Sequence, residues 1–182
     1  MNRNLTWLTD QAPSPGRERP HLETATTAHG PLIASWLPDA RALAMATGPW
    51  LGWPVDPEEL VAPSQWQVDV LVCGDDVVAT GARRRVDDHT VRLGRLLVDP
   101  ARRGRGWGRT LVTELVRACA EDPAIRQVEL GVFDDNAPAR HLYSVLGFTE
   151  TGEVRHHDVG GQRWTAVQMR LDLPTSRRDQ PR

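Results

Sequence analysis

Residues 96–110 read LLVDPARRGRGWGRT, and several local signals follow one another in this segment. An apolar strand end precedes Pro100, a turn rich in Arg and Gly follows, and an amphipathic helix begins near Trp107. Glycine has no Cβ, so a ligand can approach the main chain closely. The first turn of a helix adds unpaired N–H groups and the positive end of the helix dipole. The segment therefore predicts an anion-binding site at a helix N-terminus.

Two common phosphate-binding loops do not fit this segment. A P-loop requires G-x-x-x-x-G-K-[ST], but Arg109 stands in place of the Lys and Arg103 in place of the first Gly. A dinucleotide loop requires G-x-G-x-x-G; Gly104 and Gly106 match it, whereas Arg109 occupies the last position. The anion is thus neither a P-loop triphosphate nor a dinucleotide.

The motif that does fit is R-x-x-G-x-G, at Arg103, Gly106 and Gly108. A second segment, residues 136–148, reads NAPARHLYSVLGF and follows an apolar stretch at residues 128–132. It matches N-x-x-A-x-x-L-Y-x-x-x-G-F. With both motifs in this order, the chain resembles the GNAT superfamily of acyl-CoA N-acyltransferases, specifically over residues 68–173.

This resemblance implies an α+β fold with a mixed, mainly antiparallel central sheet flanked by helices. It also implies acetyl-CoA as cosubstrate, with its pyrophosphate on the loop, its pantetheine arm along a strand edge, and its thioester in a gap where that strand diverges from its parallel neighbour. Asn136 matches the family's cofactor-contacting Asn, and a plain helix cap is the alternative role. The implied cofactor residues are Leu97, Val98, Arg103, Gly104, Arg105, Gly106, Trp107, Gly108, Arg109 and Asn136.

Tyr143 is the candidate catalytic residue, and it is the single Tyr of the chain. When an amine attacks the thioester a thiolate leaves, and a phenol of pKa about 10 beside that sulfur can donate a proton to it. The alternative is that Tyr143 packs as an aromatic side chain on the inner face of its helix.

The general base is left open by the sequence. The strand expected at residues 90–98 contains Arg92 and Arg95 and no acid. The proton of the amine would then pass to water, or to Asp87, Asp88, His89 or Glu129.

The acceptor pocket is expected between the helices near the N-terminus and the last hairpin. Trp50 and Trp53 either form aromatic walls there or pack within the helical layer. His156 and His157 are adjacent in an expected strand, so their side chains point to opposite faces, and no metal is assigned.

Composition limits the function classes. The 182 residues fit one domain with tails, and a net charge of −2 argues against nucleic acid as a partner. No apolar run is long enough to cross a bilayer, and the N-terminus lacks the apolar core of a signal peptide, so a cytoplasmic protein is expected. We expect a flexible arm at residues 1–28, the N-acetyltransferase domain at 29–173 and a flexible tail at 174–182.

The sequence pattern also predicts the individual elements. Strands are expected at residues 32–37, 68–73, 77–84, 90–98 and 128–132, with a bulge or a close backbone approach at Gly94, and a final hairpin of residues 149–154 and 162–173. Helices are expected after Asp39, Asp56, the Arg- and Gly-rich loop and Asn136. Cys73 and Cys119 lie in apolar segments and are expected to behave as small buried hydrophobes.

The function predicted from these observations is direct acetyl transfer from acetyl-CoA to a primary amine, through a tetrahedral intermediate and without a covalent enzyme intermediate. The acceptor is a small molecule or a peptide, and a homodimer is left open. Two other functions are weighed: an acyl-CoA sensor that does not transfer the acyl group, and a transferase acting on RNA or aminoacyl-tRNA, for which residues 83–85 would contact phosphates.

Overall fold

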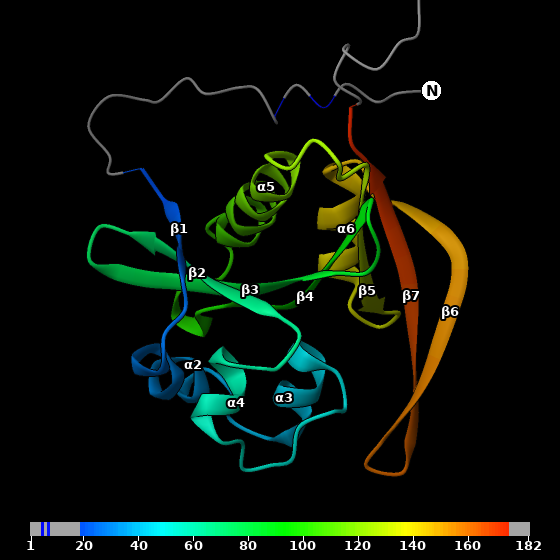
Figure 1. Ribbon diagram of the computed structural model, residues 1–182. Coiled ribbons are helices and arrows are strands. Elements are labelled where there is room, and N and C mark those ends of the chain that lie inside the picture. The colour runs from blue at the N-terminus through cyan, green and yellow to red at the C-terminus, as the bar shows by residue number, and fades with distance from the viewer. Residues whose placement is uncertain (1–4, 6, 8–18, 175–182) are drawn as a thin grey trace, which may run out of the picture.

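The computed structural model describes residues 5, 7 and 19–174, which build one seven-stranded sheet (Figure 1). Its strand order is β1-β2-β3-β4-β5-β7-β6, and β4 and β5 form its parallel pair while the other neighbours are antiparallel. The strands are β1 (His21–Thr24), β2 (Gln67–Cys73), β3 (Asp76–Arg85), β4 (Thr90–Val98), β5 (Gln127–Phe133), β6 (Thr149–Val159) and β7 (Gln162–Asp172). The predicted mixed, mainly antiparallel α+β architecture is confirmed.

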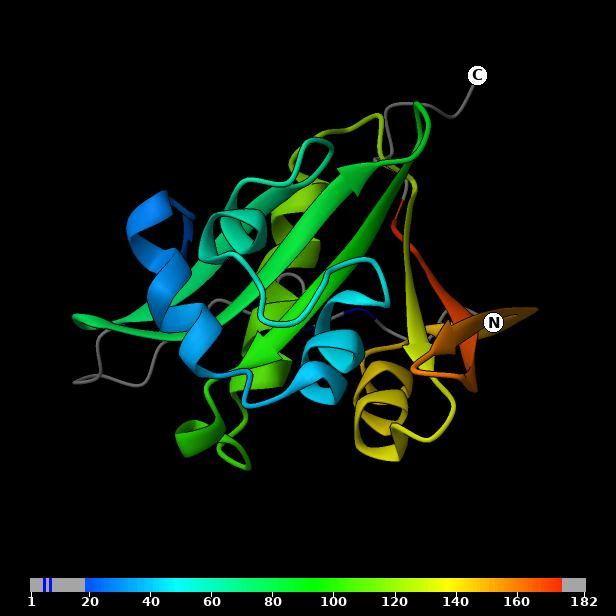
Figure 2. The same ribbon diagram turned by 90° about the horizontal axis from the view of Figure 1, so that it is seen from below.

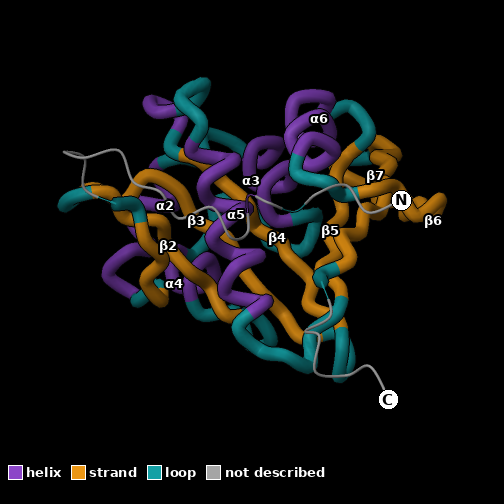
Figure 3. Tube along the Cα trace, turned by 90° about the horizontal axis from the view of Figure 1, so that it is seen from above, coloured by secondary structure: helices purple, strands orange, loops and turns teal. Residues whose placement is uncertain are grey.

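Helices cover both faces of the sheet. In Figures 1 and 3, α5 and α6 lie on one face, and Figure 2 shows α2, α3 and α4 on the other. The helices are η1 (Thr27–His29), α2 (Gly30–Ser35), α3 (Ala40–Thr47), α4 (Pro57–Val61), η2 (Pro100–Arg102), α5 (Trp107–Ala120) and α6 (Ala137–Val145). Within the described residues, every helix is too short or too polar to cross a membrane.

Two predictions near the N-terminus are wrong. Residues 32–37, expected as a strand, belong to α2 and the turn after it, because Ile33, Trp36 and Leu37 recur at helical spacing and are all buried. His21–Thr24, expected in the flexible arm, form β1 and pair with β2. Much of the predicted arm and tail lies outside the described residues, namely residues 1–4, 6, 8–18 and 175–182.

The helix boundaries follow the predicted caps. Asp39 accepts a hydrogen bond from the Ala42 amide at 2.7 Å, and Asp56 accepts one from the Glu58 amide at 3.0 Å. Asn136 caps α6 by accepting from the Ala139 amide at 3.3 Å. These local interactions start each helix where the sequence pattern places it.

The main core lies between the sheet and α5. The apolar stripe of α5 is buried there, and it consists of Leu111, Val112, Leu115, Val116 and Cys119. Burial raises the pKa of the Cys119 thiol to about 11, so this residue stays protonated and unreactive at neutral pH.

A bulge in β4 shapes the site. The pairing of β3 with β4 shifts register between Thr80 and Ala82, and Arg95 has a φ of 54°, the one positive φ of a non-glycine residue within the described part of the chain. At Gly94 a Cβ would come within 2.8 Å of the Trp66 ring, so the position requires glycine. Both features predicted as alternatives at Gly94 are therefore present: the bulge begins there, and the Trp66 ring approaches its backbone closely.

The parallel pair β4–β5 separates beyond this bulge. Paired residues run from Thr90 with Gln127 to Leu93 with Leu130, and neither strand continues the pairing although both extend further. Figure 2 shows the two strands running apart, with α3 and α6 at the wide end. The divergence implied by the family resemblance is thus present.

An ion pair on the face covered by α5 is expected to contribute strongly to stability. Arg83 donates from Nε to Asp69 Oδ2 at 2.8 Å, and the two side chains are 19% and 3% exposed. Asp69→Ala should lower the free energy of unfolding by about 3 kcal/mol, because the half-buried guanidinium loses its carboxylate. Asp135→Ala breaks an exposed pair with Arg41 and should cost less than about 1 kcal/mol. Equal losses for both variants in urea unfolding would contradict this ranking.

Candidate active site

Two hollows meet at the gap between β4 and β5. One has a volume of about 640 Å³ and lies beside α5 and α6. The other has a volume of about 390 Å³ and lies between the sheet, the C-terminal end of α3 and β6. Four residues line both hollows, namely Met45, Leu96, Asn136 and Tyr143. The gap therefore joins a site on one side of the sheet to a site on the other.

The larger hollow contains the predicted anion loop. Gly104 and Gly106 have φ values of 73° and 87°, and a Cβ at either position would meet no atom within 4 Å. Gly106 is the N-cap of α5 and supplies no side-chain cap, so the first N–H groups of this helix remain available to an anion. This backbone fits a pyrophosphate, whose charge the helix dipole also stabilises.

The edge of β4 fits an extended ligand. On one side, Leu97 and Val98 pair with Thr80 and Ala79 of β3. Their other side faces the gap, because β5 has diverged. A pantetheine chain with its amide groups could pair with this edge as an added strand does. The loop, the uncapped helix and the free edge together suit coenzyme A.

The predicted cofactor residues divide into two groups. Seven of them line the larger hollow, namely Val98, Arg103, Gly104, Gly106, Trp107, Gly108 and Asn136. Leu97, Arg105 and Arg109 are not among its lining residues. The side chain of Leu97 instead packs with the cluster beneath α2 and α4, so its contribution would come from the backbone.

Tyr143 lies where the hollows meet. Its side chain is 7% exposed, and its ring packs at 6.0 Å from Phe148. Burial raises the pKa of the phenol well above its ordinary value near 10. Tyr143 is therefore protonated at neutral pH, as a proton donor must be.

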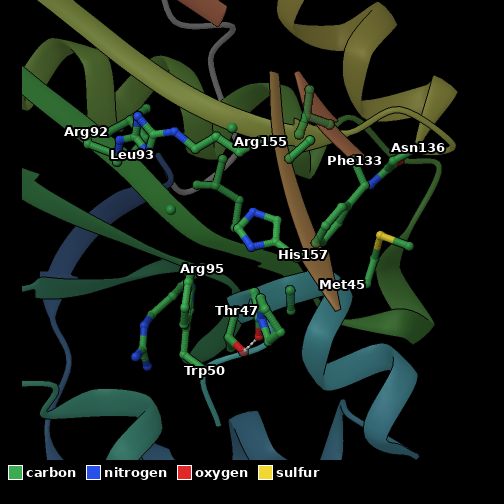
Figure 4. A pocket seen from close by; sticks show the side chains of 18 of the residues that line it. Met45, Thr47, Trp50, Arg92, Leu93, Arg95, Phe133, Asn136, Arg155 and His157 are labelled. Carbon is green, nitrogen blue, oxygen red and sulfur yellow. Dashed lines mark hydrogen bonds between the residues drawn. The ribbon is translucent and has the colours of Figure 1, made fainter. Parts of the chain in front are cut away.

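The smaller hollow has an aromatic wall. Trp50 follows α3 and is 72% exposed, and Phe133 lies at the end of β5. Of the two alternatives for the tryptophans, Trp50 lines this hollow, whereas Trp53 is not among its lining residues. Figure 4 shows the His157 ring near the middle of the hollow, with Arg92 and Arg155 on one side and Phe133 on the other.

His157 is a functional candidate that the sequence analysis did not select. Its ring contacts Trp50 edge-on at 5.5 Å and Phe133 at 6.1 Å. Burial lowers the pKa of His157, and the charges of Arg155 and His156 lower it further. The imidazole is thus neutral at pH 7 and able to accept a proton. Alternation along the strand predicts that one of the two histidines faces inward, but only the packing identifies which.

The other candidate bases lie elsewhere. Asp87, Asp88 and His89 occupy the turn between β3 and β4, outside the lining of both hollows. Glu129 accepts a hydrogen bond from Arg92 Nε at 2.8 Å and does not line the smaller hollow. No group of three or more metal-ligating side chains occurs among the described residues.

Comparison with known proteins agrees with this geometry. A mycothiol acetyltransferase of Kineococcus radiotolerans is 35% identical over 120 residues, covering 64% of this chain and 39% of the relative, so the chain spans well under half of that protein. A ribosomal-protein-alanine N-acetyltransferase from Brucella melitensis superposes with a TM-score of 0.67 at 25% identity, over 84% of this chain and 99% of the other.

A spermidine N-acetyltransferase from Vibrio cholerae, solved with CoA and spermine, has a TM-score of 0.69 at 17% identity over 84% of this chain and 95% of the other. These likenesses show a GNAT fold. The family model described as "Acetyltransferase (GNAT) family" matches residues 13–148. With both signature motifs, the divergent strands and this match across most of its length, the chain belongs to the acetyltransferase (GNAT) family.

Proposed function

We propose that this protein transfers an acetyl group from acetyl-CoA directly to an amine. The observation that carries the proposal is that Tyr143 lines both hollows at the point where they meet. One hollow suits coenzyme A and the other a small acceptor, so a reacting pair would meet beside this phenol. When bound, acetyl-CoA supplies an activated acetyl thioester.

The residues of the chain have separate tasks in this reaction. The backbone of Gly104–Gly108 and the start of α5 hold the pyrophosphate, and the free edge of β4 holds the pantetheine arm. Tyr143 donates its hydroxyl proton to the departing thiolate. Cys119 is buried and protonated, which agrees with transfer that needs no cysteine nucleophile.

His157 is the general base of this proposal. The acceptor arrives as an ammonium and must lose a proton before its nitrogen can attack. His157 lines the acceptor hollow and is neutral at pH 7. No Asp or Glu is among the residues that line this hollow, so the imidazole is the titratable acceptor nearest to the expected amine.

His157→Gln tests this role through the pH profile. The His157 ring is neutral above its pKa and protonated below it. Burial lowers this pKa from its ordinary value, so the change occurs at a lower pH than in a free imidazole. Wild-type kcat/KM should therefore fall as the pH drops below about 6.5, and the variant should lose this dependence along with about 10-fold in rate at pH 7. His156→Gln, on the opposite face of β6, is the matched control. A low-pH limb that persists in His157→Gln would contradict the assignment.

The proposed function is tested with the full chain, acetyl-CoA and a panel of amines, by following free thiol and confirming acetylated product by mass spectrometry. Transfer predicts thiol release that requires an amine. Binding of CoA in calorimetry, with no amine-dependent thiol release, would instead indicate a sensor module.

A further inference from the structure

The acceptor hollow has an unusual charge. Four arginines line it, namely Arg84, Arg92, Arg95 and Arg155, and no Asp or Glu does. An amine substrate is itself a cation at neutral pH, so a site for a simple amine would be expected to carry acids rather than arginines. The charge of the lining therefore bears on the acceptor's chemistry.

Two of these arginines are neutralised by the protein. Arg92 donates from Nε to Glu129 at 2.8 Å and from Nη2 to Gln168 at 2.9 Å. Arg155 donates from Nε to Glu153 at 3.0 Å. Each of them is paired with a carboxylate; the Arg92 pair is mostly buried, whereas the Arg155 pair is exposed and offsets the charge of Arg155 only in part.

Arg84 and Arg95 are different. Neither forms an ion pair with a carboxylate within the described part of the chain. Arg95 donates from Nη1 to the backbone oxygen of Glu59 at 2.8 Å. Burial lowers the pKa of Arg95 and the charge of Glu59 opposes this shift, so the charge of Arg95 is partly compensated. The guanidinium of Arg84 stacks over the Trp66 ring at 5.0 Å.

Arg84 also has an unsatisfied donor. Its Nε is buried and, among the described residues, has no hydrogen-bond partner. Buried donors of this kind are uncommon and costly. Because Arg84 also lines the acceptor hollow, its guanidinium is suited to pair with an anionic ligand there. Trp66 also packs against Gly94 of β4, so this strand holds in place the ring over which the Arg84 guanidinium stacks.

We propose that the acceptor is a small amine that also carries an anionic group, a carboxylate or a related oxyacid, held by Arg84. This inference deepens the proposed acetyl transfer and depends on it. The anionic group would lie toward β3 and β4, and the amine toward His157 and Tyr143 at the other end of the hollow. A volume of about 390 Å³ suits a molecule of amino-acid size.

The arrangement favours a zwitterion over a polycation. A zwitterion brings its own negative charge to the guanidinium of Arg84, whereas a polyamine would add positive charge beside it. Arginine's planar fork also matches the two oxygens of a carboxylate. Polyamines and aminoglycosides should therefore be poor acceptors of this protein.

Matched pairs of amines test the proposal. L-phenylalanine is compared with phenethylamine and L-methionine with 3-(methylthio)propylamine, alongside L-glutamate, an aminoalkylphosphonate and spermidine. We expect the best acid-bearing amine to exceed its matched amine by about 10-fold or more in kcat/KM. The aminoalkylphosphonate shows which anionic group the site accepts. Acetylation of the phosphonate as well as the carboxylates indicates a general oxyanion site, and acetylation of the carboxylates alone indicates a carboxylate site.

Other outcomes separate this inference from the proposed function. If simple amines or spermidine are the better acceptors, acetyl transfer holds and the anionic acceptor is wrong. If no acid-bearing amine binds the CoA-loaded protein in calorimetry or is acetylated, the inference is also wrong. If an acid-bearing amine binds but no thiol is released with any amine, the acetyl-transfer proposal fails while the anion site stands.

Arg84→Gln tests the anchor itself. It should lower kcat/KM for the acid-bearing amine by about 10- to 100-fold and leave the matched amine and the affinity for CoA nearly unchanged. Arg84→Lys keeps the charge and should recover part of the loss. Arg163→Gln makes the same charge change at an exposed position of β7, outside both hollows, and should behave as wild type. Equal losses for acid and matched amine in Arg84→Gln would overturn the assignment.

Discussion

Tyr143→Phe is expected to lose about 100- to 1000-fold in kcat while keeping its affinity for acetyl-CoA. The substitution removes the hydroxyl and retains the ring, so packing against Phe148 at 6.0 Å is preserved. Without the phenol, the thiolate must leave unprotonated or take its proton from water. The loss should appear in kcat rather than in KM, because the proton is needed only as the C–S bond breaks.

Ser144→Ala is the matched control for this variant. It also removes one hydroxyl from α6, but from the exposed neighbouring residue, and should leave kcat unchanged. Kd for CoA and the unfolding midpoint are measured on both variants. A Tyr143→Phe enzyme that keeps its wild-type kcat across the pH range would remove Tyr143 from the mechanism and leave it a packing residue.

Gly106→Val is expected to weaken CoA binding by about 100-fold or more, the second large effect. Gly106 has a φ of 87°, where a β-branched residue is strained, and its Cβ would project into space that a bound pyrophosphate needs. Charge-assisted hydrogen bonds from the start of α5 contribute about 1.5–3 kcal/mol each, so displacing the phosphates from two of them accounts for a loss of this size.

The control for this variant must carry the same backbone strain. Gly160→Val fits, because Gly160 has a φ of 59° and open space around its Cβ position but lies in the turn between β6 and β7. Calorimetry with CoA separates the two variants. If both lose CoA affinity equally, the effect is strain transmitted through the fold and the loop is not the pyrophosphate site.

Local signals in the chain predicted much of the fold. The helix starts at Asp39, Asp56 and Asn136 depend on side chains that lie within three residues of the amides they cap. The sequence therefore predicts these starts without knowledge of the tertiary structure. The same holds for the glycine-rich turn before α5. The one misassigned helix, α2, is six residues long, too short for its periodicity to outweigh its apolar run.

The two-motif pattern also selected the loop that we propose to bind the cofactor, and Tyr143, because each motif is contiguous. The choice of general base could not be made in this way. His156 and His157 are equivalent in the sequence, and the pairing of β6 with β7 together with Trp50 and Phe133 brings His157 into the hollow.

The nature of the acceptor site was decided by contacts between distant parts of the chain. Local sequence determined where the helices begin, where the loop turns and which phenol stands in its motif, since those depend on neighbours along the chain. Tertiary structure alone decided that Arg92 of β4 pairs with Glu129 of β5, whereas Arg84 forms no ion pair with a carboxylate among the described residues. The Arg92 pair depends on the distance between side chains on two different strands, and that distance exists only once the sheet has formed.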